Sequence, residues 1–205
     1  MFAGWGLRMR IIAGKWRSRR LEYPPESITR PMPDRVKESV FNMLGCHYGC
    51  PGELPPIQVA DVFSGGGSLG LEALSRGAVG CVFFEKERRA LDVLSRNLDA
   101  LQIGEEALVV SGDGWRKVLA WVQSDTRPMG LMFLDPPYVN SEDPSANGHV
   151  WQFLGRLTAC MSEAPMVVLH HEATIRYDEV MIEPWTLLDS RKIGSNAVTF
   201  FHVVS

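Results

Sequence analysis

Cysteine is scarce in this chain of 205 residues, which has four, at positions 46, 50, 81 and 160. So few and scattered cysteines exclude a disulfide scaffold, and Cys46, His47 and Cys50 lack the second pair of ligands that a zinc site needs. We therefore expect reduced thiols, no metal and a cytoplasmic location. Long hydrophobic runs are missing as well. The longest, such as residues 81–84, have the length of a strand, whereas a membrane span needs about 18 apolar residues.

The start of the chain shows no recognisable targeting segment. Residues 1–7 are too few for the apolar core of a signal peptide, so we expect the fold to begin at Met9. The composition is that of a soluble globular protein, with 45% hydrophobic and 22% charged residues, which excludes wholesale disorder.

The charge is distributed unevenly along the chain. The net charge is −3, but residues 1–40 contain nine Lys or Arg against four Asp or Glu and therefore carry +5. The remaining 165 residues carry −8. A basic segment joined to an acidic body predicts contact with a nucleic-acid phosphate backbone. The side chains expected to make this contact are Arg10, Lys15, Arg17, Arg19, Arg20, Arg30 and Arg35.

The chain divides by composition into residues 1–56 and 57–205. In the first part, a short strand and turn are expected at 10–14, a helix at 35–44 with Asp34 as N-cap, and a linker rich in Pro and Gly up to residue 56. We interpret this part as a basic N-terminal extension of a single α/β domain formed by the second part.

Short apolar runs alternate with amphipathic stretches from residue 57 onward. The alternation predicts parallel strands with helices on both faces of the sheet. Strands are expected at 57–63, 80–85, 107–111, 129–135 and 165–171, and helices at 69–76, 86–101, 115–122 and 150–161. Two further strands at 185–189 and 197–204, with no helix between them, predict a C-terminal hairpin.

A glycine-rich loop follows the first strand of the predicted sheet. Gly65, Gly67 and Gly70 match the pattern G-x-G-x-x-G before a helix, which allows a tight turn and the close approach of a ligand to the backbone. The pattern alone does not separate a dinucleotide site from a nucleoside-type site. Glu85 ends the second strand, where its carboxylate could accept both ribose hydroxyls of NAD or S-adenosylmethionine. Asp113 follows the third strand and could accept from an adenine amino group.

The tetrapeptide Asp135-Pro136-Pro137-Tyr138 follows the fourth strand. Proline restricts the backbone here and leaves the Pro136 carbonyl available as an acceptor. Asp135 supplies a second acceptor and Tyr138 a flat aromatic face. Two acceptors beside a stacking ring suit an exocyclic amino group on a base, because both N–H groups are held while the ring is clamped.

Several segments together resemble a known family. They include the Asp-Pro-Pro-Tyr tetrapeptide, the glycine loop, and residues 10–21, 30–38, 41–42 and 69–78, such as Arg-Pro-Met-Pro-Asp-Arg-Val-Lys-Glu. With them the chain resembles the bacterial 16S rRNA guanine-N2 methyltransferases of the RsmD type, from residue 10 to the C-terminal hairpin. It departs from the usual residues of that family at Ala13, Met32 and Gly66.

The resemblance implies a Rossmann-like methyltransferase fold with a seven-stranded, mostly parallel sheet, and S-adenosylmethionine as cofactor. The implied substrate is one guanine in the helix 31 loop of 16S rRNA, better recognised in 30S or late assembly particles than in naked RNA. We expect a monomer that does not bind membranes. The expected catalytic residues are Asp135, Pro136 and Tyr138. The expected cofactor-binding residues are Asp61, Phe63, Gly65, Gly67, Leu69, Glu85, Lys86, Asp113, Gly114 and Asp135. His149, His170, His171 and His202 show no pairing in the sequence and are interpreted as structural or surface residues.

Three other functions compete with this interpretation. A nicotinamide-dependent oxidoreductase would use the glycine loop and Glu85, but it leaves residues 135–138 unexplained and lacks a second catalytic domain. A non-catalytic RNA-binding protein would explain the basic extension but not the acceptor tetrapeptide. An adenine-N6 methyltransferase could use the same tetrapeptide, and only the resemblance of the N-terminal segment separates it from a guanine-N2 enzyme.

Overall fold

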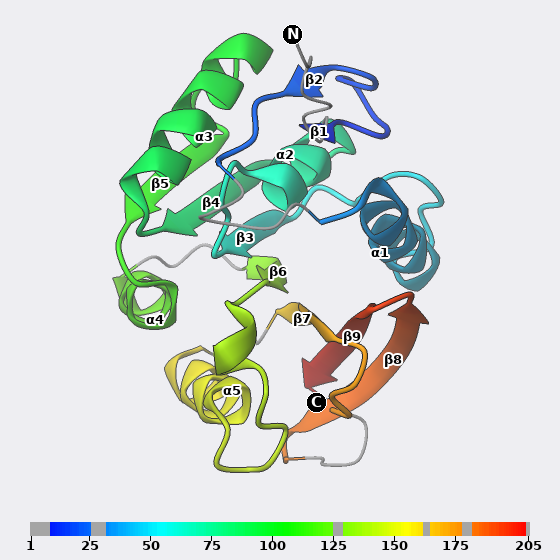
Figure 1. Cartoon of the computed structure of the whole chain (residues 1–205), viewed down its shortest axis with the longest axis vertical. Helices are drawn as coiled ribbons and strands as arrows, with labels where there is room; N and C mark the ends of the chain where they lie inside the picture. Colours follow the sequence, from blue (N-terminus) through cyan, green and yellow to red (C-terminus); the bar gives the residue numbers. More distant parts are fainter. Residues whose placement is uncertain (1–8, 26–31, 125–128, 162–164, 178–181, 204–205) are drawn as a thin grey trace, which may run out of the picture.

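A seven-stranded sheet forms the centre of the molecule (Figure 1). The computed structural model describes residues 9–25, 32–124, 129–161, 165–177 and 182–203. The strands of the sheet are β3 (Gln58–Val62), β4 (Gly80–Glu85), β5 (Ala107–Ser111), β6 (Met129–Leu134), β7 (Met166–Glu172), β8 (Trp185–Ile193) and β9 (Asn196–Val203). Their order across the sheet is β5-β4-β3-β6-β7-β9-β8, with β3 to β7 parallel and β9 antiparallel to β7 and β8. The predicted fold class and C-terminal hairpin are confirmed.

Helices cover both faces of this sheet. They are α1 (Asp34–His47), α2 (Ser68–Ser75), α3 (Arg88–Leu101), α4 (Gly114–Ser124) and α5 (His149–Cys160), with a 3-10 turn η1 (Tyr138–Asn140). Helices α1, α2 and α3 contribute to one buried cluster, and α4 and α5 to a second. Phe83 and Phe84 enter different clusters because successive side chains of a strand point to opposite faces. No helix among the described residues has the length and apolar character needed to cross a membrane.

Most predicted element boundaries lie within three residues of the observed ones, and two predictions need correction. Pro33, and not Asp34, is the N-cap of α1, because Asp34 is already the first helical residue; its carboxylate accepts a hydrogen bond from Arg10 Nε at 3.0 Å. Strand β8 continues to Ile193 instead of ending at residue 189. Its last residues are mostly exposed, so the hydrophobic pattern ends before the backbone pairing with β9 does.

The N-terminal segment forms a small hairpin in which β1 (Met9–Arg10) pairs antiparallel with β2 (Arg20–Leu21). Met9, Ile11 and Leu21 belong to the same buried cluster as residues of α2 and α3. The boundary that we predicted at residue 56 therefore separates two parts that share a hydrophobic core.

A buried carboxylate joins this hairpin to α2. The side chain of Glu72 is fully buried and accepts backbone hydrogen bonds from Ile12 at 2.8 Å and Ala13 at 2.9 Å. It also pairs with Arg76 at 2.8 Å and Lys37 at 3.4 Å, and both cations are themselves buried. Burial lowers the pKa of Lys37, which the Glu72 carboxylate opposes. A buried carboxylate needs partners of this kind to offset its lost hydration.

Candidate active site

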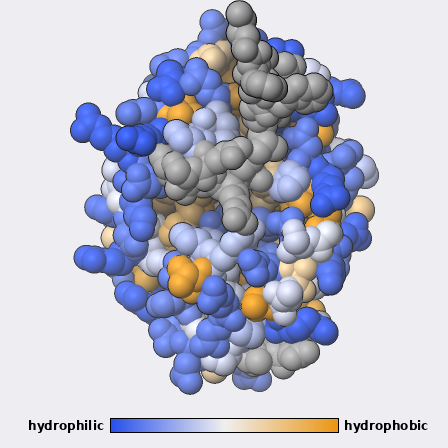
Figure 2. Space-filling view, viewed as in Figure 1, coloured by the Kyte–Doolittle hydropathy of each residue, from blue (hydrophilic) through white to orange (hydrophobic). Residues whose placement is uncertain are grey.

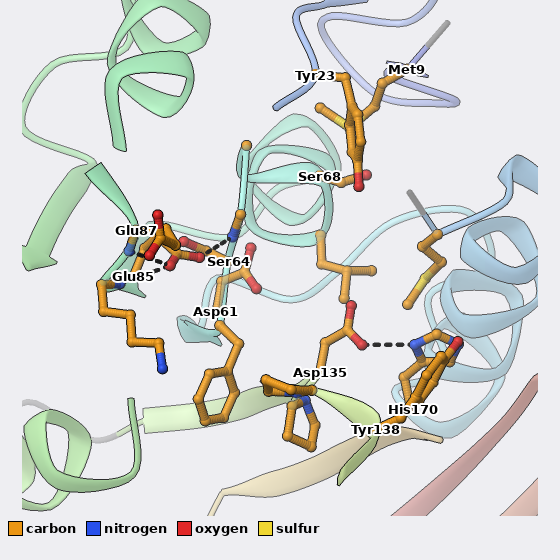
Figure 3. A pocket seen from close by; sticks show the side chains of 18 of the residues that line it. Met9, Tyr23, Asp61, Ser64, Ser68, Glu85, Glu87, Asp135, Tyr138 and His170 are labelled. Atoms are coloured by element: carbon orange, nitrogen blue, oxygen red, sulfur yellow. Dashed lines mark hydrogen bonds and ion pairs between the residues drawn. The ribbon is translucent and has the colours of Figure 1, made fainter. Parts of the chain in front are cut away.

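A pocket of about 610 Å³ opens where the carboxyl ends of β3, β4, β6 and β7 meet (Figure 3). The strand order reverses here, because the chain places β4 and β5 on one side of β3, and β6 and β7 on the other. Ligands of open α/β sheets bind at such reversal points. Nine residues predicted from the sequence line the pocket: Asp61, Phe63, Gly65, Leu69, Glu85, Lys86, Asp135, Pro136 and Tyr138.

The glycine-rich loop closes one side of this pocket. Gly65 has a φ of 54° and Gly67 a φ of 87°, in the left-handed region that favours glycine, and Gly67 is the N-cap of α2. Phe63, which lines the pocket, also has a positive φ, of 65°. A bulky residue in this region is strained, and such strain clusters at ligand sites.

Gly67 does not line the pocket, although we expected it to admit the cofactor. A Cβ atom on Gly67 would lie 2.6 Å from Leu94 Cδ1, and one on Gly70 would lie 2.4 Å from Phe83 Cε1. Both distances are shorter than any van der Waals contact. These two glycines therefore allow α2 to pack closely on α3 and on β4, and the pattern reflects packing as much as ligand approach.

The Glu85 carboxylate accepts hydrogen bonds from three nearby backbone N–H groups. Its Oε2 accepts from the N–H of Gly65 at 2.8 Å, and its Oε1 accepts from the N–H groups of Lys86 at 2.7 Å and Glu87 at 2.8 Å. A carboxylate has about four acceptor positions, so about one remains for a ligand. Glu85 thus fixes the glycine loop, which the sequence did not indicate, and could accept one ribose hydroxyl more readily than two.

Asp61 is a buried acid that supports the loop from the end of β3. Its Oδ2 accepts from the N–H of Gly70 at 2.8 Å, and the residue is 1% exposed. Burial raises the pKa of Asp61 to about 7; the hydrogen bond from Gly70 opposes this rise, and the charges of Asp135 and Glu85 add to it. A positively charged ligand beside Asp61 would favour the ionised carboxylate and lower this pKa.

The Ser64 hydroxyl was missed by the sequence reasoning. It lines the pocket, is 8% exposed, and its Oγ finds no hydrogen-bond partner among the described residues. Buried polar atoms are rarely left unpaired unless a ligand or water completes them. A polar group of a bound cofactor would supply the missing hydrogen bond to Ser64 Oγ.

The acceptor tetrapeptide forms the opposite side of the pocket. Asp135 Oδ1 lies 2.7 Å from His170 Nδ1, and Figure 3 shows the other carboxylate oxygen directed into the pocket. The Tyr138 ring lies beside the imidazole, with 6.4 Å between ring centroids. Within the described residues, no backbone N–H is recorded as donating to the Pro136 carbonyl, whereas the Pro137 carbonyl accepts from Asn140.

His170 belongs to this site, which corrects our interpretation of it as a structural or surface residue. Leu134 pairs with Leu169 across β6 and β7, so the next residues, Asp135 and His170, lie side by side. Its other ring nitrogen, Nε2, lies 2.9 Å from Asn196 Oδ1 in β9. The sequence does place His170 near the carboxyl end of the strand that follows β6. Only the sheet order shows that this strand is a neighbour of β6.

Asp113 and Gly114 lie outside the pocket lining. Asp113 Oδ1 accepts from the N–H of Arg116 at 3.2 Å, at the start of α4. Gly114 sits against Phe63, since a Cβ atom there would lie 3.0 Å from Phe63 Cε1. Their expected contact with the cofactor stays a prediction.

The predicted RNA-binding side chains differ in how they are engaged. Arg10 pairs with Asp34, and Arg19 Nη2 donates to the Ala100 carbonyl at 2.6 Å. Lys15, Arg17, Arg20 and Arg35 are exposed, and Arg30 lies outside the described residues. The face of the molecule seen in Figure 2 is mostly hydrophilic, with apolar residues scattered over it.

The family model described as "Conserved hypothetical protein 95" matches residues 9–202. This chain belongs to that family. The resemblance to RsmD-type methyltransferases is thereby confirmed. Among curated relatives, "Ribosomal RNA small subunit methyltransferase D" of Escherichia coli is 36% identical over 131 residues, which cover 64% of this chain and 61% of the relative. The match thus spans about three fifths of that relative's length.

Solved structures place the chain in the methyltransferase fold. "Putative methyltransferase yhhF from Escherichia coli" superimposes with a TM-score of 0.74 at 28% identity, covering 96% of this chain and 98% of the other. A Streptococcus mutans structure complexed with SAH shares the fold at 14% identity and a TM-score of 0.62, covering 82% of this chain and 48% of the other. Methyltransferases of this fold use S-adenosylmethionine, the cofactor that the sequence predicts.

Proposed function

We propose that this protein transfers a methyl group from S-adenosylmethionine to the exocyclic N2 amino group of one guanine in 16S rRNA, in the small ribosomal subunit in the cytoplasm. One observation carries the proposal. The acceptor tetrapeptide and the glycine loop, far apart in sequence, line the same pocket. The similarity to small subunit rRNA methyltransferase D supports rRNA as the substrate.

The pocket as a whole suits a cationic nucleoside cofactor. Among the described residues that line the pocket, only Lys86 and His170 have side chains that can carry a positive charge. Six lining residues have a carboxyl group: Asp61, Glu85, Glu87, Asp135, Glu142 and Glu172. S-adenosylmethionine carries a sulfonium and an ammonium group, and its activated methyl supplies the reaction's driving force. We infer that Asp61 and Ser64 bind its polar end and that Glu85 accepts from its ribose.

The acceptor side then has to align a poor nucleophile. The amino lone pair of guanine is delocalised into the ring, so holding both N–H groups on Asp135 and the Pro136 carbonyl favours a pyramidal nitrogen. Positive charge develops on this nitrogen as the bond forms, and the Asp135 carboxylate stabilises it electrostatically. Tyr138 would stack on the base once it has left its neighbours.

The N-terminal segment connects RNA binding with this chemistry. Met9, Tyr23 and Met32, all from residues 1–56, line the pocket. The exposed cations Lys15 and Arg17 lie in the turn between β1 and β2, on the same segment. We infer that the segment binds RNA phosphates, which positions the substrate without reading its sequence.

The decisive experiment measures methyl transfer from labelled S-adenosylmethionine to 30S subunits that lack the modification. Naked 16S rRNA and duplex DNA are tested in parallel, and the product nucleoside is identified by mass spectrometry. We expect N2-methylguanosine from the 30S subunits. N6-methyladenine from DNA would favour the adenine-N6 alternative, and no transfer to any substrate would refute the proposal.

A variant pair ties this activity to the pocket. Asp135→Ala should lower turnover about 100-fold or more while nearly preserving cofactor affinity. Asp143→Ala is the matched control, because Asp143 is exposed and outside the pocket lining. Equal turnover in the two variants would remove Asp135 from the mechanism.

A further inference from the structure

His170 is held on both ring nitrogens by oxygen atoms. Nδ1 lies 2.7 Å from Asp135 Oδ1 and Nε2 lies 2.9 Å from Asn196 Oδ1. Carboxylate and amide oxygens are acceptors only, so each ring nitrogen is placed to donate a hydrogen. A neutral imidazole has one N–H, and only the imidazolium has two. The two contacts together therefore favour the charged ring.

The surroundings of His170 support this protonation state. Its side chain is 7% exposed, and burial alone would lower its pKa. The charge of Asp135 and the hydrogen bonds with Asp135 and Asn196 outweigh burial, so the pKa of His170 is raised. The other ionisable groups on this side of the pocket are Tyr138 of η1, Glu142 after it, and Glu172 of the same strand. Asp61, at the end of β3, interacts electrostatically with Asp135, the partner of His170.

For the Asp135 carboxylate, the described part of the chain shows no side-chain hydrogen bond other than this contact. Its side chain is 31% exposed, while His170 lies behind it on the rigid strand β7. A distance of 2.7 Å is that of a charge-assisted hydrogen bond, which is stronger and more directional than a neutral one. The contact occupies Oδ1 and leaves the second oxygen facing the pocket (Figure 3).

We propose that His170, supported by Asn196, is a positioning residue that holds Asp135 in the orientation needed to accept a hydrogen from the substrate amino group. This inference rests on the proposed function, in which Asp135 contacts that amino group. In this role His170 acts through Asp135 and not on the reacting atoms. Its effect is expected in the turnover number and not in cofactor affinity.

The first test compares substitutions of His170 in methyl transfer to 30S subunits. His170→Ala frees Asp135 and should lower kcat about 10- to 100-fold, the scale of a misplacement near 1 Å, with unchanged binding of S-adenosylmethionine by calorimetry. His170→Asn places an amide N–H near the position of Nδ1, so it should recover most of the lost kcat. His171→Asn is the matched control. His171 is also buried in the same strand but contacts Thr199, so its variant can lose thermal stability without losing kcat.

The second readout is the dependence of kcat on pH. In the wild type, the imidazolium is present below the pKa of His170 and is lost as the pH rises through it. We therefore expect kcat to decline on the alkaline side with the same midpoint as the His170 titration seen by NMR. His170→Asn, which does not titrate, should lack this decline. A kcat of His170→Ala within twofold of the wild type, or the same alkaline decline in His170→Asn, would overturn the inference.

A third measurement separates the inference from the proposed function. The pKa of His170, followed by NMR in the full chain, should fall in Asp135→Asn because the neighbouring charge is lost. This titration needs no substrate. If the wild type methylates nothing, the proposed function fails, whereas an unchanged pKa of His170 in Asp135→Asn would refute the inference whatever the activity.

Discussion

Replacing Glu72 with glutamine should destabilise the protein, because Glu72 is the shared partner of two buried cations. Glu72 carries the only negative charge that the structure shows in contact with the side chains of Lys37 and Arg76 among the described residues, and these are 1% and 3% exposed. Removing one partner of a buried ion pair costs about 3–5 kcal/mol. The glutamine oxygen keeps one of the two acceptors for Ile12 and Ala13, and its NH₂ group faces the other.

The expected value lies at the lower end of this range. Burial already lowers the pKa of Lys37, so this lysine can release its proton when the carboxylate is lost. With a loss of about 3 kcal/mol and a urea dependence of about 2 kcal/mol per M, the midpoint of urea unfolding should fall by about 1.5 M. The measurement is equilibrium unfolding followed by circular dichroism.

Glu22→Gln is the matched control for this variant. Glu22 also pairs with an arginine, Arg96 at 2.7 Å, but both side chains are more than half exposed. Such pairs contribute about 0–1 kcal/mol. If the two variants unfold at the same urea concentration, the buried network does not stabilise the N-terminal hairpin on α2, and our reasoning about it is wrong.

Three further predictions concern the pocket and the exposed cations of the N-terminal segment. Glu85→Ala should weaken binding of S-adenosylmethionine about 10- to 100-fold, since it removes a ribose acceptor and the anchor of the glycine loop; unchanged calorimetric affinity would exclude both roles. Asp61 has a pKa of about 7 in the fold against 3.8 ordinarily, so it binds a proton more tightly when folded. As the pH rises from 3.8 to about 7, the free energy of unfolding of the wild type should therefore decrease relative to that of Asp61→Asn. If urea unfolding gives the two proteins the same pH dependence of this free energy across that range, Asp61 does not take up a proton in the fold. Neutralising Lys15, Arg17 and Arg20 should weaken RNA binding and reduce its salt dependence by about one unit of slope per lost phosphate contact; an unaltered slope would mean that these cations stay solvated.

The helices and strands were predicted well because the hydrophobic patterns that indicate them are formed by neighbouring residues. Parallel strands covered on both faces need continuous apolar runs, and the runs at 80–85 and 129–135 coincide, to within one residue, with the buried strands β4 and β6. The apolar face of α3 repeats with helical spacing, which indicated a helix up to Leu101. The boundary errors occurred where the backbone pairs without an apolar pattern, as in the second half of β8.

The candidate site was only partly visible from the sequence. Asp135 and Glu85 were found because they end strands, and the carboxyl ends of parallel strands share one edge. The second function of Glu85, anchoring Gly65, depends on the distance between two loops. Ser64 was missed because an unpaired hydroxyl can be recognised only when its surroundings are known.

The sequence by itself determined the alternation of strands and helices, the glycine loop, the acceptor tetrapeptide and the basic segment. Each of these is written in neighbouring residues, because hydrophobic periodicity and turn chemistry act over a few positions. The tertiary structure alone decided which distant residues meet. The insertion of β6 and β7 beside β3, and of β9 beside β7, brings His170 and Asn196 behind Asp135. Pairing of this kind follows from sheet order, which the folding of the whole chain selects and no local pattern encodes.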